Sequence, residues 1–183
     1  MKTINELTEK IGINHLNEMQ GAVVKAIQHT NDNIMVLSPT GSGKTLAYIL
    51  PLVCMVDSAS DDLQAIVIVP GRELALQSLN VLRSLGNDVR GYACYGGRPT
   101  MDEHRQLRQL KPHIIFATPG RMNDHIDKDN VDVDSVKWII IDEFDKCLEM
   151  GFHEEMSYLI NRLPFKARQI LLSATPAEEM RHQ

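Results

Sequence analysis

The sequence alternates short apolar runs with longer segments in which apolar residues recur every three or four positions, and this alternation restricts the fold most strongly. Short runs rich in Val, Ile and Leu indicate strands buried on both faces, and the longer spacing indicates amphipathic helices. Repeated strand–helix units are typical of an α/β fold in which a parallel sheet is flanked by helices on both faces. The predicted strands cover residues 34–37, 65–69, 91–94, 113–117, 137–141 and 169–172.

Length and composition favour one folded domain. The chain has 183 residues, of which 43% are hydrophobic, and it contains neither an internal repeat nor a linker long enough to divide it. We therefore predict a single domain over 1–183, present as a monomer. No apolar run approaches the roughly 20 residues of a membrane span, and the N-terminus lacks the apolar region of a signal peptide. These features predict a cytoplasmic protein without membrane contact.

The segment SPTGSGKT, residues 38–45, follows a predicted strand and opens a predicted helix. In that context its glycines let successive backbone N–H groups point toward a phosphate, and the helix presents its positive end to the same group. Lys44 would bring a full charge to the β and γ phosphates, and the Thr45 hydroxyl would reach Mg²⁺. The predicted nucleotide contacts in this loop are Thr40, Gly41, Ser42, Gly43, Lys44 and Thr45.

A second candidate feature is the segment KWIIIDEFD, residues 137–145, an apolar strand that ends in adjacent carboxylates. Mg²⁺ is usually held by one or two carboxylates together with phosphate oxygens, which makes Asp142 a predicted metal ligand beside Thr45. Glu143 is the predicted base that orients the attacking water. The alternative for the two acids is an ordinary acidic start of a surface helix, which the helix dipole favours.

Charge is unevenly distributed although the whole chain carries −5. Residues 70–121 hold eight Lys or Arg against four Asp or Glu, and residues 122–163 hold four against eleven. A polyanion such as a nucleic acid is therefore expected to meet one face only. The alternative is that the arginines form ordinary solvated helix faces.

Six segments, in order, resemble motifs of the DEAD-box RNA helicases. They are SPTGSGKT, PGRELA (70–75), Gly96-Gly97, TPGR (118–121), DEFD (142–145) and SAT (173–175). The resemblance implies a RecA-like P-loop NTPase fold with ATP and Mg²⁺ as cofactors and RNA as partner. It also implies an ATP hydrolase that couples hydrolysis to RNA unwinding or remodelling.

The resemblance carries roles over to particular residues. It implies that Lys44, Asp142 and Glu143 form the catalytic set, in agreement with the chemical argument above. Sequence-independent contacts to the RNA sugar-phosphate backbone are implied for Pro70, Arg72, Gly97, Thr118, Gly120 and Arg121. A connection between the ATP site and strand opening is implied for Asp145, Ser173 and Thr175.

The sequence departs from the family pattern in the adenine-recognition segment, residues 1–30. Gln20 stands where the family has a glutamine that reads the adenine edge, but Thr3 and Ile4 stand where an aromatic ring would stack on the base. We therefore expect weak discrimination between ATP and GTP. Two further departures are Gly71 in place of a threonine and Phe144 in place of an alanine, and the Phe144 ring is expected to find an apolar pocket.

Family members complete the ATP site with a second RecA-like domain, whose arginines reach across to the γ-phosphate. The sequence ends at Gln183 before any such domain, so we expect these residues to be part of a longer protein. Two other functions remain open at this point. One is a DNA helicase or translocase of the same superfamily, and the other is an ATP-dependent clamp that holds RNA without unwinding it.

Overall fold

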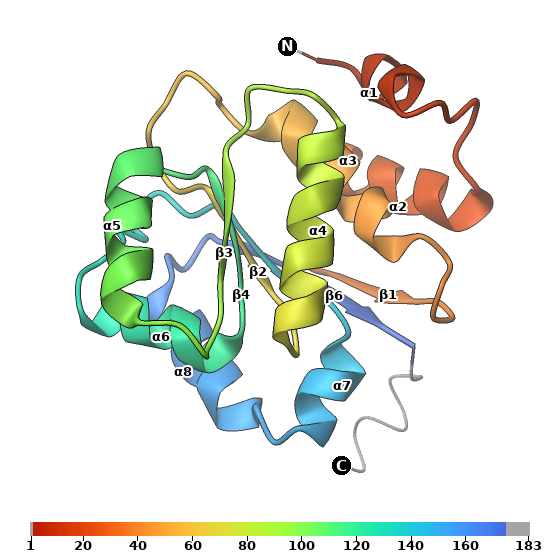
Figure 1. Cartoon of the computed structure of the whole chain (residues 1–183). Helices are drawn as coiled ribbons and strands as arrows, with labels where there is room; N and C mark the ends of the chain where they lie inside the picture. Colours follow the sequence, from red (N-terminus) through yellow and green to blue (C-terminus); the bar gives the residue numbers. More distant parts are fainter. Residues whose placement is uncertain (1, 175–183) are drawn as a thin grey trace.

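In the computed structural model, which describes residues 2–174, six strands form one sheet in the order β1-β6-β5-β2-β4-β3 (Figure 1). Every neighbouring pair is parallel. The strands are β1 Ile34–Leu37, β2 Ala65–Ile68, β3 Gly91–Cys94, β4 Ile114–Ala117, β5 Trp138–Ile141 and β6 Arg168–Ser173. The α/β prediction is confirmed, and each predicted strand is present with its ends shifted by at most one residue.

Helices connect the strands. They are α1 Ile4–Lys10, α2 Glu18–His29, α3 Lys44–Met55, α4 Arg72–Ser84, α5 Thr100–Leu110, α6 Pro119–Asp127, α7 Phe144–Glu149 and α8 His153–Arg162. Across the described residues, none of these helices is long and apolar enough to cross a membrane.

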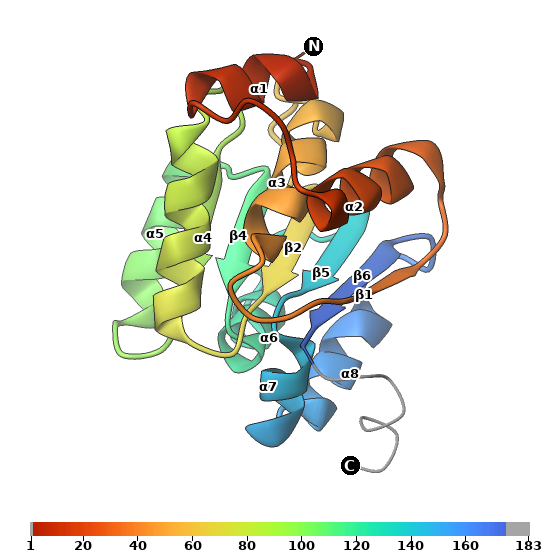
Figure 2. The same ribbon diagram turned by 90° about the vertical axis from the view of Figure 1, so that its right-hand side faces the viewer.

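The sheet is covered on both faces because its side chains alternate between two apolar clusters (Figure 2). In β5, Trp138 and Ile140 join the cluster formed with α1 to α4, whereas Ile139 and Ile141 join the cluster formed with α5 to α8. Phe144 packs against the second cluster, so its bulky ring does find an apolar pocket. Burial on both faces explains why β2, β4 and β5 are continuous apolar runs, whereas β1, at the edge of the sheet, leaves Met35 and Leu37 exposed.

The strand order places the candidate site residues in two neighbouring groups. The loops that carry the phosphate-binding candidates follow β1 and β5, and β6, which ends at Ser173, lies between these two strands in the sheet. The loops that carry the RNA-binding candidates follow β2, β4 and β3, which are adjacent on the other side. Since all six strands are parallel, both groups lie at the carboxyl edge of the sheet, where ligands of open α/β sheets bind.

Candidate nucleotide site and nucleic-acid interface

The loop between β1 and α3 has the curled backbone expected of a phosphate-binding loop. Gly41 and Gly43 have φ angles of 82° and 85°, in the left-handed region that disfavours other residues. Ser42 Oγ donates to the Pro39 carbonyl at 2.6 Å and accepts from Ser38 Oγ at 2.9 Å, which holds the curl together. Gly43 is the N-cap of α3, so the positive end of that helix begins directly after the loop.

The start of α2 braces the phosphate loop from outside. Asn17 and Gln20 form a reciprocal cap at the N-terminus of α2, in which each side chain bonds to the backbone N–H of the other residue. Asn17 Nδ2 also donates to the Ser42 carbonyl at 3.0 Å, and Gln20 Nε2 donates to the Gly43 carbonyl at 3.2 Å. Gln20 is therefore bonded within the protein at both ends of its amide, and its predicted contact with adenine stays a prediction.

Asp142, at the end of β5, lies beside the phosphate loop. Its carboxylate is 3% exposed, accepts the Thr45 hydroxyl at 3.4 Å through Oδ2 and accepts the Glu143 backbone N–H at 2.9 Å through Oδ1. Burial raises the pKa of Asp142 to about 6, and the neighbouring Glu143 charge adds to the rise. The positive charge of Lys44 opposes that rise only in part.

Asp142 and Thr45 fit a divalent cation. Within residues 2–174, no Lys, Arg or His forms an ion pair with the buried Asp142 carboxylate. A hard cation prefers oxygen ligands, and a carboxylate beside a hydroxyl supplies two of them. The residues present therefore match the predicted Mg²⁺ contact.

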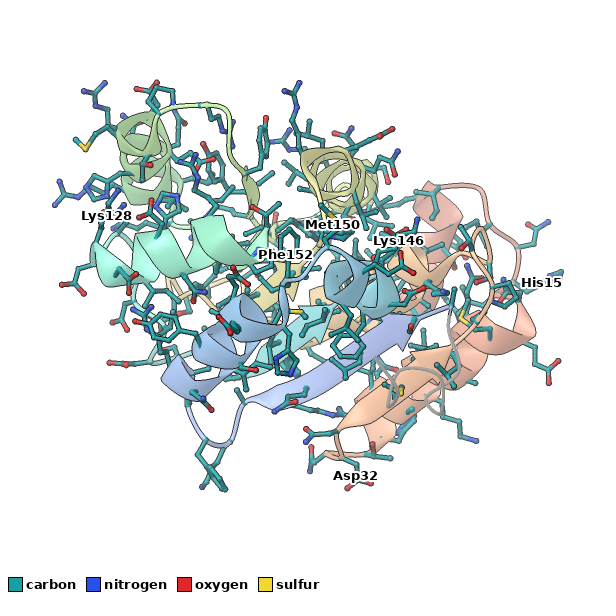
Figure 3. All side chains as sticks on the ribbon, turned by 90° about the horizontal axis from the view of Figure 1, so that it is seen from below. His15, Asp32, Lys128, Lys146, Met150 and Phe152 are labelled. Carbon is teal, nitrogen blue, oxygen red and sulfur yellow. The ribbon has the colours of Figure 1, made fainter. Side chains whose placement is uncertain are left out.

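Glu143 is the N-cap of α7 and has a φ angle of 51°, a left-handed conformation that costs a non-glycine residue about 1–2 kcal/mol. Backbone strain of this kind concentrates at functional positions. The Lys146 ammonium group, on α7 and labelled in Figure 3, lies 3.4 Å from Glu143 Oε1. Among the described residues, Glu143 forms this one ion pair, and its side chain is partly exposed.

These residues line one cavity of about 270 Å³. Thr40, Gly41, Gly43, Lys44 and Thr45 form its floor, and the cavity also meets the carboxylates that end β5. Sequence reasoning missed four residues of its wall, which are Leu74, Gln77, Lys146 and Ala174. Leu74 lies within PGRELA and Gln77 follows three positions later on α4, and this helical spacing was the available signal.

The residues proposed to couple the site to strand opening lie near the same cavity. Asp145 is buried on α7 and lines the cavity. Ser173 is buried at the end of β6, and its carbonyl accepts the backbone N–H of Ser38 at 3.0 Å, so β6 contacts the phosphate loop directly. Thr175 lies outside the described residues.

The RNA-binding candidates come from loops after neighbouring strands. Pro70 and Arg72 lie after β2, and the exposed Gly97, with a φ angle of 94°, lies after β3. Thr118 is the N-cap of α6, and Gly120 is exposed in the first turn of that helix. The structure thus brings together residues that lie up to 50 positions apart in the sequence.

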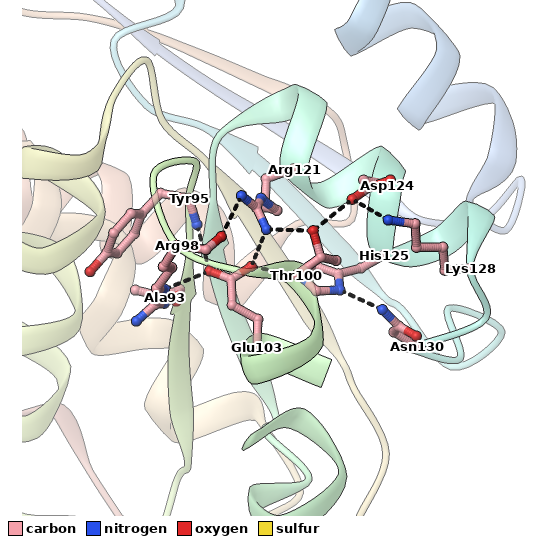
Figure 4. A network of polar contacts seen from close by, with 10 residues as sticks. All are labelled: Ala93, Tyr95, Arg98, Thr100, Glu103, Arg121, Asp124, His125, Lys128 and Asn130. Atoms are coloured by element: carbon pink, nitrogen blue, oxygen red, sulfur yellow. Dashed lines mark hydrogen bonds and ion pairs between the residues drawn. The ribbon is translucent and has the colours of Figure 1, made fainter. Parts of the chain in front are cut away.

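Sequence reasoning missed Glu103, the buried centre of a polar network between α5 and α6 (Figure 4). Its carboxylate accepts the Tyr95 backbone N–H at 3.0 Å and Arg98 Nε at 2.8 Å. It also lies 2.7 Å from His125 Nε2 and 3.4 Å from Arg121 Nη1. No motif marks Glu103, because a single acidic residue on an amphipathic helix looks like a solvated surface residue.

Cys94 Sγ lies with Glu103 and His125 in a set of ligand atoms that are all within 4.8 Å of one another. Such a trio resembles a metal site, but both oxygens of Glu103 already form hydrogen bonds with protein groups. Burial raises the pKa of the Cys94 thiol, which disfavours the thiolate that a metal would need. The trio is therefore part of the polar network.

The sequence matches the DEAD/DEAH box helicase family over residues 17–182. It is 42% identical, over 146 residues, to the ATP-dependent RNA helicase CshA of Limosilactobacillus reuteri, an alignment that covers 78% of this chain and 29% of the relative. It is 36% identical, over 179 residues, to the DEAD-box ATP-dependent RNA helicase CshA of Bacillus subtilis (strain 168), covering 96% of this chain and 35% of the relative. The chain thus spans about a third of the length of these curated relatives.

Among solved structures, the fold is similar to a DEAD box protein from the hyperthermophile Methanococcus jannaschii. The TM-score is 0.90 at 29% sequence identity, and the superposition covers 100% of this chain and 50% of that one. Family match, relatives and fold agree with the motif residues that the structure brings to one edge of the sheet. The chain belongs to the DEAD/DEAH box helicase family.

Proposed function

We propose that this chain binds ATP with Mg²⁺ and the sugar-phosphate backbone of RNA, and that it works as one domain of an ATP-dependent RNA helicase. One observation carries the nucleotide part of the proposal. Thr45 and Asp142 are 97 positions apart, yet a hydroxyl and a buried carboxylate meet beside Lys44 in a single cavity. A hydroxyl, a carboxylate and an ammonium group on a curled glycine loop form the set that a Mg²⁺–nucleotide needs.

Each residue has a definite task in this proposal. Backbone N–H groups of residues 40–45 and the start of α3 would bind the phosphates, and Lys44 would neutralise charge on the β and γ groups. Thr45 and Asp142 would hold Mg²⁺, which supplies charge stabilisation for phosphoryl transfer. Glu143 would orient the water that attacks the γ-phosphate.

A second domain of the same protein is part of the proposal. The chain spans about a third of the curated relatives, so longer proteins carry the same domain. Cationic side chains supplied from outside a phosphate loop contribute about 10³ to 10⁵ to the rate of related phosphoryl transfers. We expect residues 1–183 alone to bind nucleotide modestly, to bind RNA feebly and to hydrolyse ATP very slowly.

The test uses the full-length protein and two variants. Glu143→Gln should keep ATP affinity and lower RNA-stimulated hydrolysis by orders of magnitude, whereas Lys44→Ala should lower ATP affinity itself. Glu154→Gln is the matched control, because Glu154 is an exposed acid on α8 outside the cavity. Turnover by Glu143→Gln equal to that of Glu154→Gln would refute the role of Glu143.

The same protein preparation separates the other two functions. Release of a labelled strand from an RNA duplex, dependent on ATP, supports a helicase. ATP-dependent binding to RNA without strand release supports a clamp. Stimulation of hydrolysis by single-stranded DNA as strong as that by RNA supports a DNA translocase.

A further inference from the structure

We propose that Glu103 is a positioning residue for the RNA-binding face, and that it holds Arg98 and Arg121 as internal struts while Arg72 contacts RNA phosphate. The inference rests on the proposed RNA binding and revises one of its contacts. Arg121, in TPGR, would then shape the binding surface without contacting the nucleic acid.

Glu103 is a buried carboxylate that is surrounded by hydrogen-bond donors. Its side chain is fully buried, and a buried carboxylate is tolerated only where several donors surround it. Three protein donors and the Arg121 guanidinium surround it here, and they come from the turn after β3 and from α6 (Figure 4). The hydrogen bonds from His125 and Arg98 lower the pKa of Glu103, although burial opposes them, so the carboxylate stays charged.

His125 links Asn130 to Glu103 through the two nitrogens of its ring. Asn130 Nδ2 lies 2.9 Å from His125 Nδ1, and His125 Nε2 lies 2.7 Å from Glu103 Oε1. If the Asn130 amide donates to Nδ1, the ring N–H is left on Nε2 and donates to Glu103. In that arrangement the ring N–H of His125 satisfies one oxygen of the Glu103 carboxylate.

Arg121 is committed to partners inside the protein. Its Nη1 donates to Thr100 Oγ1 at 2.9 Å and lies 3.4 Å from Glu103 Oε1, and its Nη2 donates to the Arg98 carbonyl at 3.0 Å. Its side chain is only 13% exposed. To bind a phosphate, Arg121 would have to give up these bonds and leave the buried Glu103 carboxylate with less positive charge beside it, which costs free energy.

Arg98 is committed in a similar way. Its Nε donates to Glu103, its Nη2 donates to the Ala93 carbonyl, and its guanidinium lies 4.2 Å from the centre of the Tyr95 ring. Glu103 also accepts the Tyr95 backbone N–H. One carboxylate therefore fixes the backbone at Tyr95 and the side chain of Arg98, on either side of Gly97.

Arg72 differs from these two arginines. Its side chain is exposed, and within the described residues it forms neither an ion pair nor a hydrogen bond. Its guanidinium lies 5.6 Å from the Tyr95 ring centre, so the ring that Arg98 and Glu103 fix also supports Arg72. Arg72 thus keeps its N–H donors available for a phosphate, and the network sets where they lie.

The salt dependence of RNA binding tests this assignment. Each phosphate neutralised on a single strand changes the slope of log affinity against log salt by about 0.7. We would measure the affinity of full-length protein for a labelled single-stranded oligouridine over a range of KCl concentrations. Arg72→Gln should weaken binding and reduce the slope by about 0.7.

Arg121→Gln and Glu103→Gln should each weaken binding about tenfold at one salt concentration and leave the slope unchanged. The double variant should bind RNA no less tightly than whichever single variant has the lower RNA affinity, because both changes break the same network. Asp102→Asn, an exposed acid next to Glu103 in the sequence, is the matched control and should leave affinity unchanged. ATP affinity measured on each variant reports whether the fold is intact.

Arg121→Lys gives a second test if the other variants fold poorly. A lysine keeps the positive charge but cannot bond to Thr100, Glu103 and the Arg98 carbonyl together. If Arg121 acts only through these internal bonds, Arg121→Lys should lose RNA affinity. If Arg121 contacts a phosphate, Arg121→Lys should largely keep its RNA affinity. A slope reduced by about 0.7 in Arg121→Gln, or full affinity in Arg121→Lys, would overturn the inference. Absence of RNA binding by the unmodified protein would instead overturn the proposed function.

Discussion

Thr45 Oγ1 lies 3.4 Å from Asp142 Oδ2, although 97 positions separate the two residues in the chain. They meet because β1, which precedes the Thr45 loop, and β5, which precedes Asp142, lie on either side of β6. Strand order therefore builds the candidate metal contact. Substitutions in the residues around this contact should therefore change both the stability of the fold and its affinity for nucleotide.

Asp142→Asn should raise the free energy of unfolding at pH 7. The folded pKa of Asp142 is raised to about 6, above an unfolded value near 3.9, so the folded state binds more protons between these values. Stability is then highest below pH 4 and falls as pH rises through 6, by about 3 kcal/mol in total. Denaturant unfolding at pH 4 and pH 7, without nucleotide, measures the effect.

In this experiment the advantage of Asp142→Asn over the unmodified chain should be small at pH 4 and approach about 3 kcal/mol at pH 7. The same substitution should weaken Mg²⁺-dependent nucleotide binding, because an amide binds the cation less strongly than a carboxylate. A less stable variant at pH 7 would contradict the burial argument.

Gly43→Ala should destabilise the chain more than Gly41→Ala. Both glycines have left-handed backbones, so either alanine costs about 1–2 kcal/mol in strain. A Cβ at Gly43 would also lie 2.4 Å from Gln20 Nε2, whereas a Cβ at Gly41 meets nothing within 4 Å. Moving Gln20 breaks its bond to the Gly43 carbonyl and adds about 1 kcal/mol.

Thermal unfolding of both variants, measured with and without Gln20→Ala, separates the cost of backbone strain from the cost of the close approach to Gln20. Removing the Gln20 side chain should make the two alanine substitutions cost the same. A difference that persists in the Gln20→Ala background would show that the collision is not its cause.

Gln20→Ala should lower affinity for ATP and for GTP by similar factors. The Gln20 amide caps α2 and holds the Gly43 carbonyl, so its loss loosens the phosphate loop whichever base is bound. Neither Thr3 nor Ile4 offers an aromatic ring for an adenine base. Calorimetric titration of both nucleotides measures the ratio, and a loss confined to ATP would show that Gln20 reads the base.

Arg168→Met should destabilise the fold by about 3 kcal/mol without changing nucleotide affinity. The buried Arg168 guanidinium donates to the Ala26 and Ile27 carbonyls at the end of α2, and also to Thr30 Oγ1 and the Asp32 carbonyl. Methionine would remove all four of these hydrogen bonds. Burial lowers the pKa of Arg168, in keeping with this desolvated position.

Arg105→Met is the matched control for Arg168→Met. Arg105 is 69% exposed and meets one carboxylate, Asp102, at 3.7 Å, so its loss should cost less than about 1 kcal/mol. Chemical denaturation of both variants measures the difference. Equal effects would mean that the bonds of Arg168 to α2 contribute little.

Local sequence was sufficient for the strands, the phosphate loop and the carboxylates after β5. Apart from β3, which reads GYAC, the strands are short runs rich in Val, Ile and Leu, and an apolar run of this kind can be recognised without knowledge of its neighbours. The glycines of residues 38–45 likewise signal their own backbone conformation, since left-handed φ angles at Gly41 and Gly43 are a local requirement.

Only the tertiary structure decided which arginines are exposed and which are bonded to groups inside the protein. Arg72 and Arg121 look equivalent in the sequence, since each follows a proline–glycine pair, but one is exposed and the other bonds to Thr100, Glu103 and Arg98. Glu103 contacts His125, 22 positions away, and Gln20 bonds to the Gly43 carbonyl, 23 positions away. Hydrogen bonds between distant segments depend on how helices pack against the sheet, and no local pattern of residues encodes that packing.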